Sequence, residues 1–247
     1  MIKNILSVQT WARRSRAIVA CAVAVCSISA CSDSDDDASE DSTTEALEPS
    51  DLSFFVTSTT HDGDLGGLDG ADEICQELAD AAGAGDKDWA AYLSAENGGT
   101  PIHARSRIGE GPWSNAAGVV VAENIEALHE LIGDPELFIT EEGEQINGQW
   151  NGSNGMDGAP VNEHDIMTGS DSLGMLMLDM TTTCADWTSN TLTPGPQVGH
   201  TDGMGPMMNT SEARFTSWNG GHAAQGCSAA DLAARGGAGR FYCFATN

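Results

Sequence analysis

Residues 66–83 read Gly-Gly-Leu-Asp-Gly-Ala-Asp-Glu-Ile-Cys-Gln-Glu-Leu-Ala-Asp-Ala-Ala-Gly. Apolar and small side chains recur every three or four positions in this stretch, which predicts a helix from Asp69 to Ala82. Gly83 then ends the helix, because glycine is the usual residue just past a helix C-terminus. The apolar stripe consists of Ala71, Ile74, Cys75, Leu78 and Ala82, so Cys75 is expected to face the core.

Short apolar runs on both sides of this helix predict strands at residues 54–59, 89–93 and 137–139, and a last strand at 240–245. A second helix is expected at about 123–132, ended by Gly133. Helices come early and strands dominate late, which favours an α+β fold over repeated βαβ units. Two long glycine- and asparagine-rich segments, 143–165 and 189–226, show little regular pattern and are expected to be functional loops or disorder.

The N-terminus carries an export signal. Residues 1–16 contain four basic and no acidic side chains, and residues 17–30 are apolar, which predicts a signal peptide over residues 1–30. Fourteen helical residues would span about 21 Å, less than the ~30 Å hydrocarbon core, so a permanent span is not expected. Ile28-Ser29-Ala30-Cys31 resembles the bacterial lipobox, which implies lipid attachment at Cys31. The alternative is an ordinary signal peptide that contains a cysteine.

Residues 31–51 are acidic, with Leu47 as their one large apolar side chain, and are expected to form a disordered tether. The whole chain has 37 Asp plus Glu against 10 Lys plus Arg, a net charge of −27. This charge argues against nucleic acid, heparin-like polyanions and the membrane surface as partners. The lipid anchor is the expected membrane contact. The charge permits cations as ligands, but a high-salt or marine habitat explains the acidic composition better than dedicated binding of several calcium ions does.

Four cysteines follow the tether: Cys75, Cys184, Cys227 and Cys243. An even number of cysteines in an exported chain indicates two disulfides. Spacing alone allows three pairings and does not choose among them.

Several segments together resemble endostatin-like domains and bacterial lipoprotein domains with the same pattern. They are residues 66–76, 89–94, 165–171 and 184–188, together with Cys227 and Cys243. The resemblance covers roughly residues 54–246. It implies a C-type-lectin-like fold for residues 52–247, with two helices packed on a twisted, mostly antiparallel sheet whose first and last strands are adjacent. It also implies the disulfides Cys75–Cys243 and Cys184–Cys227.

The lectin-like fold that this resemblance implies favours a non-catalytic ligand-binding or adhesion domain that takes a saccharide or an extracellular protein. The export signal and the lipid anchor predict the cell envelope as its location, and Ser32 after Cys31 favours the outer membrane or cell surface. Some family properties have no counterpart here. The clustered arginines and the histidine-rich N-terminus of endostatin are missing, and so is the Glu-Pro-Asn triplet of sugar-binding lectins. Trp218-Asn219-Gly220 matches only two positions of the Trp-Asn-Asp strand that holds calcium in those lectins.

Two tryptophan–asparagine pairs in loop sequence are the candidate ligand-binding residues, because an exposed indole stacks on sugars or anchors a protein partner. The alternative is that these tryptophans bury the loops. The candidates are Trp150, Asn151, Trp218 and Asn219.

No cofactor is required by the sequence, but calcium is a candidate, because calcium binds six to eight oxygens on pliable loops. Turn formation alone would also explain these Asn and Asp residues. The candidate ligands are Asn154, Asp157, Asn162, Glu163, Asp165 and Asp171.

The six histidines, at 61, 103, 129, 164, 200 and 222, form no zinc-binding spacing. An enzyme is therefore not expected. The alternative is a metal-dependent hydrolase that uses His164, Asp165 or His61, with His164 as a base next to an orienting carboxylate. A third hypothesis is a structural envelope lipoprotein with no small ligand.

Overall fold

The computed structural model describes residues 51–177 and 182–247. The signal peptide, Cys31 and residues 32–50 of the tether lie outside the described residues.

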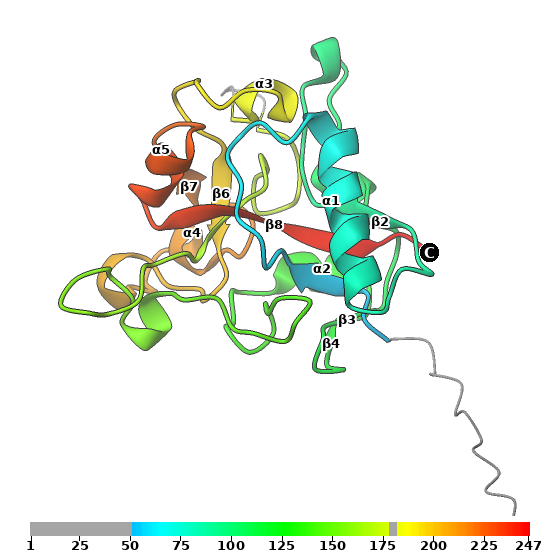
Figure 1. Cartoon of the computed structure of the whole chain (residues 1–247), viewed down its shortest axis with the longest axis horizontal. Coiled ribbons are helices and arrows are strands. Elements are labelled where there is room, and N and C mark those ends of the chain that lie inside the picture. Colours follow the sequence, from blue (N-terminus) through cyan, green and yellow to red (C-terminus); the bar gives the residue numbers. More distant parts are fainter. Residues whose placement is uncertain (1–50, 178–181) are drawn as a thin grey trace, which may run out of the picture. The chain divides into compact units, whose positions relative to one another are not determined.

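Strand β8 (Gly237–Ala245) runs through the middle of the main sheet (Figure 1). Strand β1 (Phe54–Val56) and strand β2 (Trp89–Ala91) both pair with its C-terminal half in antiparallel fashion. Phe54 lies opposite Phe244, and Ala90 also lies opposite Phe244. The expected adjacency of the first and last strands is therefore confirmed.

The other half of the sheet consists of β5 (Asp165–Met167), β6 (Gln197–His200) and β7 (His222–Ala223). β5 pairs with β8 in parallel, β6 with β5 in antiparallel fashion, and β7 with β6 in antiparallel fashion. The strand order is β1-β8-β5-β6-β7, with β2 on β8 as well. The sheet is mostly antiparallel, as expected.

Helix α1 (Gly67–Ala81) lies against β2 and β8 (Figure 1). It buries Ala71, Cys75 and Ala79, close to the predicted stripe. Helix α2 (Ile125–Glu130) is shorter than the predicted 123–132, because Asn124 has extended backbone and its side chain caps the helix by accepting a hydrogen bond from Ala127 N. Three further short helices follow: α3 (Cys184–Trp187), α4 (Ala213–Thr216) and α5 (Ala229–Ala233).

Several short elements complete the described part of the chain. There, a small two-stranded sheet pairs β3 with β4, and four 3₁₀ turns lie in the connections. These elements are β3 (Trp113–Ser114), β4 (Val120–Ala122), η1 (Asn97–Gly99), η2 (Ala104–Ser106), η3 (Gln149–Asn151) and η4 (Pro206–Met208).

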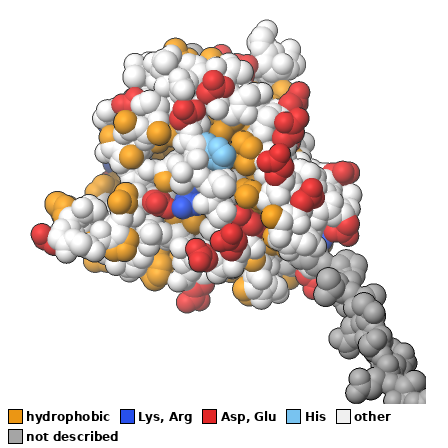
Figure 2. Space-filling view, in the orientation of Figure 1, with side chains coloured by type: hydrophobic (Ala, Val, Ile, Leu, Met, Phe, Trp, Pro, Cys, Tyr) orange, Lys and Arg blue, Asp and Glu red, His pale blue; other side chains and the backbone are white. Residues whose placement is uncertain are grey.

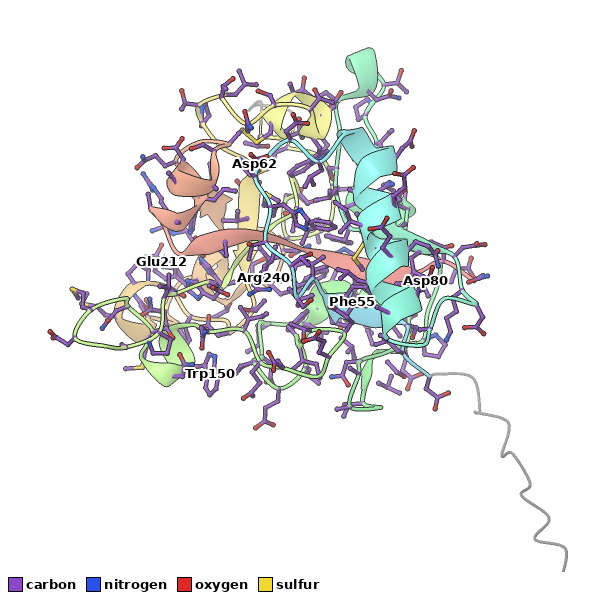
Figure 3. All side chains as sticks on the ribbon, viewed as in Figure 1. Phe55, Asp62, Asp80, Trp150, Glu212 and Arg240 are labelled. Atoms are coloured by element: carbon purple, nitrogen blue, oxygen red, sulfur yellow. A yellow bond between two sulfur atoms is a disulfide. The ribbon has the colours of Figure 1, made fainter. Side chains whose placement is uncertain are left out.

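The core lies on both faces of β8, because successive strand side chains point to opposite sides. Phe241 and Cys243 join the cluster beneath α1, together with Phe55 of β1 (Figure 3). Tyr242 and Phe244 join the second cluster, which contains Trp113 and Trp218 among others. An α+β fold is therefore confirmed at the level of its sheet and helices.

Both disulfides link residues that are distant in sequence. Cys75 of α1 is bonded to Cys243 of β8, and Cys184 of α3 is bonded to Cys227. All four cysteines are buried. The pairing implied by the family resemblance is the one that the structure contains.

Three local predictions are wrong. The first strand ends at Val56 rather than at residue 59. Residues 137–139 form no strand, and Ile139 takes part only in an isolated bridge with Gln145. The segment 189–226 contains β6, β7 and α4, because β6 forms by pairing with β5 and β7 by pairing with β6, and neither strand has a local pattern that predicts it.

Acidic side chains are spread over the face shown in Figure 2, where few basic ones are visible. Among the described residues, no helix is both long and apolar enough to cross a membrane.

Candidate functional site: a buried histidine–aspartate centre

Pairing of three strands brings Asp165, His200 and His222 to one face of the sheet. Asp165 lies directly opposite His200 in the β5–β6 pair, and His222 lies opposite Val198 in the β6–β7 pair. Directly opposite residues share a face, and residues two apart on one strand also do. The fourth member, His164, directly precedes β5, and its ring stacks on that of His200 with centroids 4.9 Å apart.

The Nε2 atoms of three imidazoles approach one carboxylate. His164 Nε2 lies 3.2 Å and His200 Nε2 3.4 Å from Asp165 Oδ1, and His222 Nε2 lies 3.3 Å from Asp165 Oδ2. These separations are within ion-pair range, yet neither Asp165 oxygen has a hydrogen-bond partner with acceptable geometry among the described residues. We call these four residues the histidine–aspartate centre.

Each Nδ1 atom of the centre faces an acceptor. His164 Nδ1 lies 2.7 Å from Asp202 Oδ1, His200 Nδ1 2.9 Å from the carbonyl of Phe215, and His222 Nδ1 3.0 Å from the carbonyl of Ala223. Carboxylate and carbonyl oxygens only accept hydrogen bonds, so each Nδ1 carries its proton and donates it. On each of the three rings, Nε2 is therefore the nitrogen that can either carry a second proton or bind a cation.

Burial disfavours the protonated, charged form of these imidazoles, and neighbouring groups decide whether the pKa of each ring is raised or lowered. For His164, burial lowers the pKa, but the hydrogen bond to Asp202 and the charges of Asp165 and Asp202 outweigh it and raise the pKa. For His222, burial is likewise outweighed by Asp165, and the pKa is raised. For His200, burial prevails and lowers the pKa. Burial would raise the pKa of Asp202, but its hydrogen bond with His164 lowers it.

The centre is nearly closed to solvent. The side chains of His164, Asp165 and His200 are 5%, 2% and 2% exposed, whereas that of His222 is 27% exposed. In the part of the chain that the structure describes, His164, Asp165 and His200 are the one group of three or more His, Cys, Asp or Glu residues whose ligand atoms all lie within 4.8 Å of one another. Chemically, such a centre can share protons or bind a cation.

Of the two tryptophan–asparagine pairs predicted to bind a saccharide or a protein, one is buried and the other is at least partly exposed. Trp218 is 1% exposed, its Nε1 donates to the carbonyl of Leu128 at 3.0 Å, and its ring stacks on Phe138. Asn219 is also buried and donates to the Tyr92 hydroxyl. The interpretation of Trp218 and Asn219 as an exposed ligand surface is therefore wrong, because these side chains pack in the second core cluster.

Trp150 and Asn151 lie on η3 at the rim of the domain (Figure 3). Trp150 is partly exposed, and its Nε1 donates to the carbonyl of Ile146 at 2.9 Å. Asn151 is exposed and accepts a hydrogen bond from the Ser153 hydroxyl. This pair stays a ligand-binding candidate.

The six calcium candidates do not form one group of ligands, because those with described contacts each have a different partner. Glu163 binds Arg240, Asp165 faces the three imidazoles, and Asp171 accepts hydrogen bonds from the backbone of its own turn. Asn154 and Asn162 likewise accept from backbone N–H groups two residues on. The carboxylate of Asp157 belongs to no cluster of possible metal ligands among the described residues. Turn formation explains most of this oxygen-rich sequence.

The remaining hydrolase candidate, His61, does not belong to the cluster of possible ligands, and its Nε2 lies 2.8 Å from the Thr59 hydroxyl. Sequence reasoning found His164 and Asp165 but missed His200, His222 and Asp202. The available signal was strand alternation, which puts Val198 and His200 on one face. This alternation does not stand out in the sequence, because the run is only four residues long and lies between glycine-rich turns.

Comparison with models of known protein families and with curated proteins found no match to this chain. The geometry of the residues themselves therefore carries the functional argument.

Proposed function

We propose that the chain is an exported protein of the cell envelope, anchored by lipid at Cys31, whose residues 52–247 form a C-type-lectin-like binding domain without catalytic activity. The observation that carries this proposal is that two buried disulfides use every cysteine of residues 51–247. Structural disulfides persist in oxidising compartments outside the cytoplasm. The export signal would deliver the chain to such a compartment. The paired first and last strands and the mostly antiparallel sheet support the fold.

Two neighbouring loops, residues 146–161 and 201–209, are the surface that we assign to ligand binding; we call them the paired loops. Turn η3 contacts η4, and Trp150 N donates to Asp202 Oδ2 at 3.3 Å. The paired loops carry four of the nine exposed large apolar side chains of the described residues, so apolar exposure is concentrated there. These four are Met156, Val161, Met207 and Met208.

An extracellular protein fits the paired loops better than a saccharide does. Exposed apolar patches mark protein contacts, and flexible methionines adapt to a partner surface. Met207 is 91% and Met208 60% exposed. A saccharide site requires an aromatic face, and of the two candidate indoles only that of Trp150 reaches the surface.

Binding can be tested with the purified full-length protein on arrays of extracellular proteins and of glycans, with and without calcium. We expect a saturable protein partner that is lost in Met207→Ser/Met208→Ser and retained in Leu192→Ser. Leu192 is a suitable control because it is exposed at 44% but lies outside the paired loops. A partner unaffected by the methionine changes would reject the assigned surface, and calcium-dependent glycan signals would replace the protein ligand with a saccharide.

Anchoring is tested separately. Mass spectrometry of the protein from its native membrane should find a lipidated cysteine at the N-terminus, at Cys31. A soluble mature form that begins at another residue would contradict anchoring without affecting the binding experiment.

A metal-dependent hydrolase is the second candidate function, favoured by the hydrogen bond of His164 to Asp202, which resembles a base with its orienting carboxylate. Burial argues against it, since His164 is 5% exposed and a base must reach its substrate. Hydrolysis of ester, peptide or phosphate substrates that is abolished by His164→Ala would support the hydrolase. If neither binding nor hydrolysis is found, the structural lipoprotein becomes the better description.

A further inference from the structure

We infer that His164, Asp165, His200 and His222 bind one divalent transition-metal ion of the zinc type. This inference concerns the histidine–aspartate centre and does not depend on the lipid anchor or on the ligand of the paired loops.

The nitrogen lone pairs of the three imidazoles are directed toward a common position. Each Nδ1 donates its proton to Asp202, to Phe215 O or to Ala223 O, so a neutral ring presents an unprotonated Nε2. All three Nε2 atoms lie 3.2–3.4 Å from an oxygen of Asp165. Four electron pairs that meet in this way repel one another unless a positive charge lies among them. A metal ion supplies that charge and is the usual reason for fixing a histidine through its other nitrogen.

The carboxylate of Asp165 also requires a positive charge beside it. Its side chain is 2% exposed, and both carboxylate oxygens are buried without a hydrogen bond among the described residues. Buried charges in proteins are either paired or bound to a metal. The one described cationic contact of this carboxylate is with the three imidazoles, so a metal ion or additional protons on Nε2 must balance its charge.

The Nε2–oxygen spacing of the donor atoms matches that of zinc ligands. Ligands at about 2.0–2.1 Å from a zinc ion at tetrahedral angles are about 3.3–3.4 Å apart. The observed Nε2–oxygen separations are 3.2, 3.3 and 3.4 Å. His164, Asp165 and His200 form the inner set, whose ligand atoms all lie within 4.8 Å of one another. His222 lies outside this set: its Nε2 faces Oδ2 of Asp165 on the more exposed side, and its ring must move inward to become the fourth ligand.

The donor atoms define the class of metal. Three imidazole nitrogens and one carboxylate suit zinc and its first-row neighbours such as cobalt, nickel and copper. Calcium and magnesium prefer shells made of oxygen. This nitrogen-rich site shares only Asp165 with the candidate calcium ligands that the sequence suggests.

The local backbone leaves room for this arrangement. A Cβ atom at Gly221 would lie 3.0 Å from Cε1 and 3.3 Å from Nε2 of His200. The glycine therefore keeps the approach to the ligand atom of His200 open, directly before His222 in the chain.

With four protein ligands the site is of the closed, structural kind, because catalytic zinc sites keep one position for water or substrate. The ion would join the start of β5 to His200 and His222. These two histidines flank the connection 201–221, which contains η4 and α4. Metal binding would therefore fasten the loop that carries Met207 and Met208.

The test uses the full-length protein with a histidine-free affinity tag, treated with a chelator and then titrated with Zn²⁺ or Co²⁺. We expect one ion per chain by elemental analysis and an intense visible spectrum of tetrahedral Co²⁺. Limited proteolysis within residues 201–221 should slow when Zn²⁺ is added.

Three variants localise the ion. Asp165→Asn and His200→Ala should lower affinity at least 100-fold, and His222→Gln 10- to 100-fold. His61→Gln, which changes another partly exposed histidine, should bind as the wild type does. Because Asp165 and His200 are buried, changing them also destabilises the fold, so His222→Gln and the wild-type titration decide the question. Failure of the wild type to retain Zn²⁺ at micromolar concentration, or unchanged affinity in His222→Gln, overturns the inference and leaves a centre balanced by protons alone.

Discussion

Cys75, in the middle of α1, is bonded to Cys243 in the last strand, with their Cα atoms 5.5 Å apart and a sequence separation of 168. The bond ties the first helix to the strand on which the sheet is built. Almost the whole folded domain lies within the loop that it closes, whereas Cys184–Cys227 closes a loop with a sequence separation of only 43.

Loss of the Cys75–Cys243 bond should destabilise the domain more than loss of Cys184–Cys227. On the chain-entropy model, closing these loops contributes about 5 and about 4 kcal/mol, as upper values. The double alanine variants, unfolded in urea without reductant, should show that order in the free energy of unfolding. Equal stability of both variants and the wild type would show that neither bond constrains the unfolded chain.

Replacing Trp218 should be far more damaging than replacing Trp150. Trp218→Phe loses the hydrogen bond to Leu128 O and leaves space between Phe138 and Tyr242, which should cost about 2–4 kcal/mol. Trp150→Phe loses one hydrogen bond at a partly exposed site, which should cost about 1 kcal/mol or less. Urea midpoints check both values, and a larger loss for Trp150→Phe would contradict the packing described here.

The Arg240–Glu163 ion pair should contribute to stability. The Arg240 guanidinium donates to Glu163 Oε2 at 2.6 Å and to the carbonyls of Thr57 and Ser58, and both side chains are mostly buried. Glu163→Gln should lower the free energy of unfolding by about 1–3 kcal/mol. The matched control is Glu212→Gln, which removes an ion pair whose side chains are more than half exposed and should change stability by less than about 1 kcal/mol. Thermal unfolding of both variants side by side distinguishes these outcomes.

His129 should make stability depend on pH. Burial, opposed in part by the hydrogen bond to Ile125 O, lowers the pKa of His129 below its ordinary value of 6.5. The unfolded chain therefore takes up this proton more readily than the folded one. The stability from the neutral ring, which bonds to the Tyr92 hydroxyl, is complete above pH 6.5 and is lost as pH falls from 6.5 toward the lower folded-state pKa.

The pH effect is measured as a difference between the wild type and His129→Gln, because other histidines titrate in the same range. The wild type should lose stability relative to the variant as pH falls from 7.5 to 5.5, by at most about 1.4 kcal/mol per pH unit. Glutamine is chosen because its carbonyl oxygen can still accept from Tyr92. A difference that stays constant over this range would place the folded-state pKa of His129 at its unfolded value.

The sequence by itself determined those helices and strands that a short, continuous residue pattern specifies. The apolar stripe around Cys75 predicts α1 to within two residues at its start and one at its end, since helical periodicity needs no partner. The last strand is also clear, because five consecutive apolar residues are buried on both faces of the sheet. Export, lipid attachment at Cys31 and the acidic tether remain predictions from sequence, outside the described residues.

Tertiary structure alone decided which side chains meet. Whether a tryptophan is exposed depends on what packs over it, so Trp218 and Trp150 look alike in sequence and differ in burial. The histidine–aspartate centre depends on strand register, because a shift of one residue would turn His200 to the other face of the sheet. Register is set by pairing between distant segments, and no spacing rule along the chain can report it.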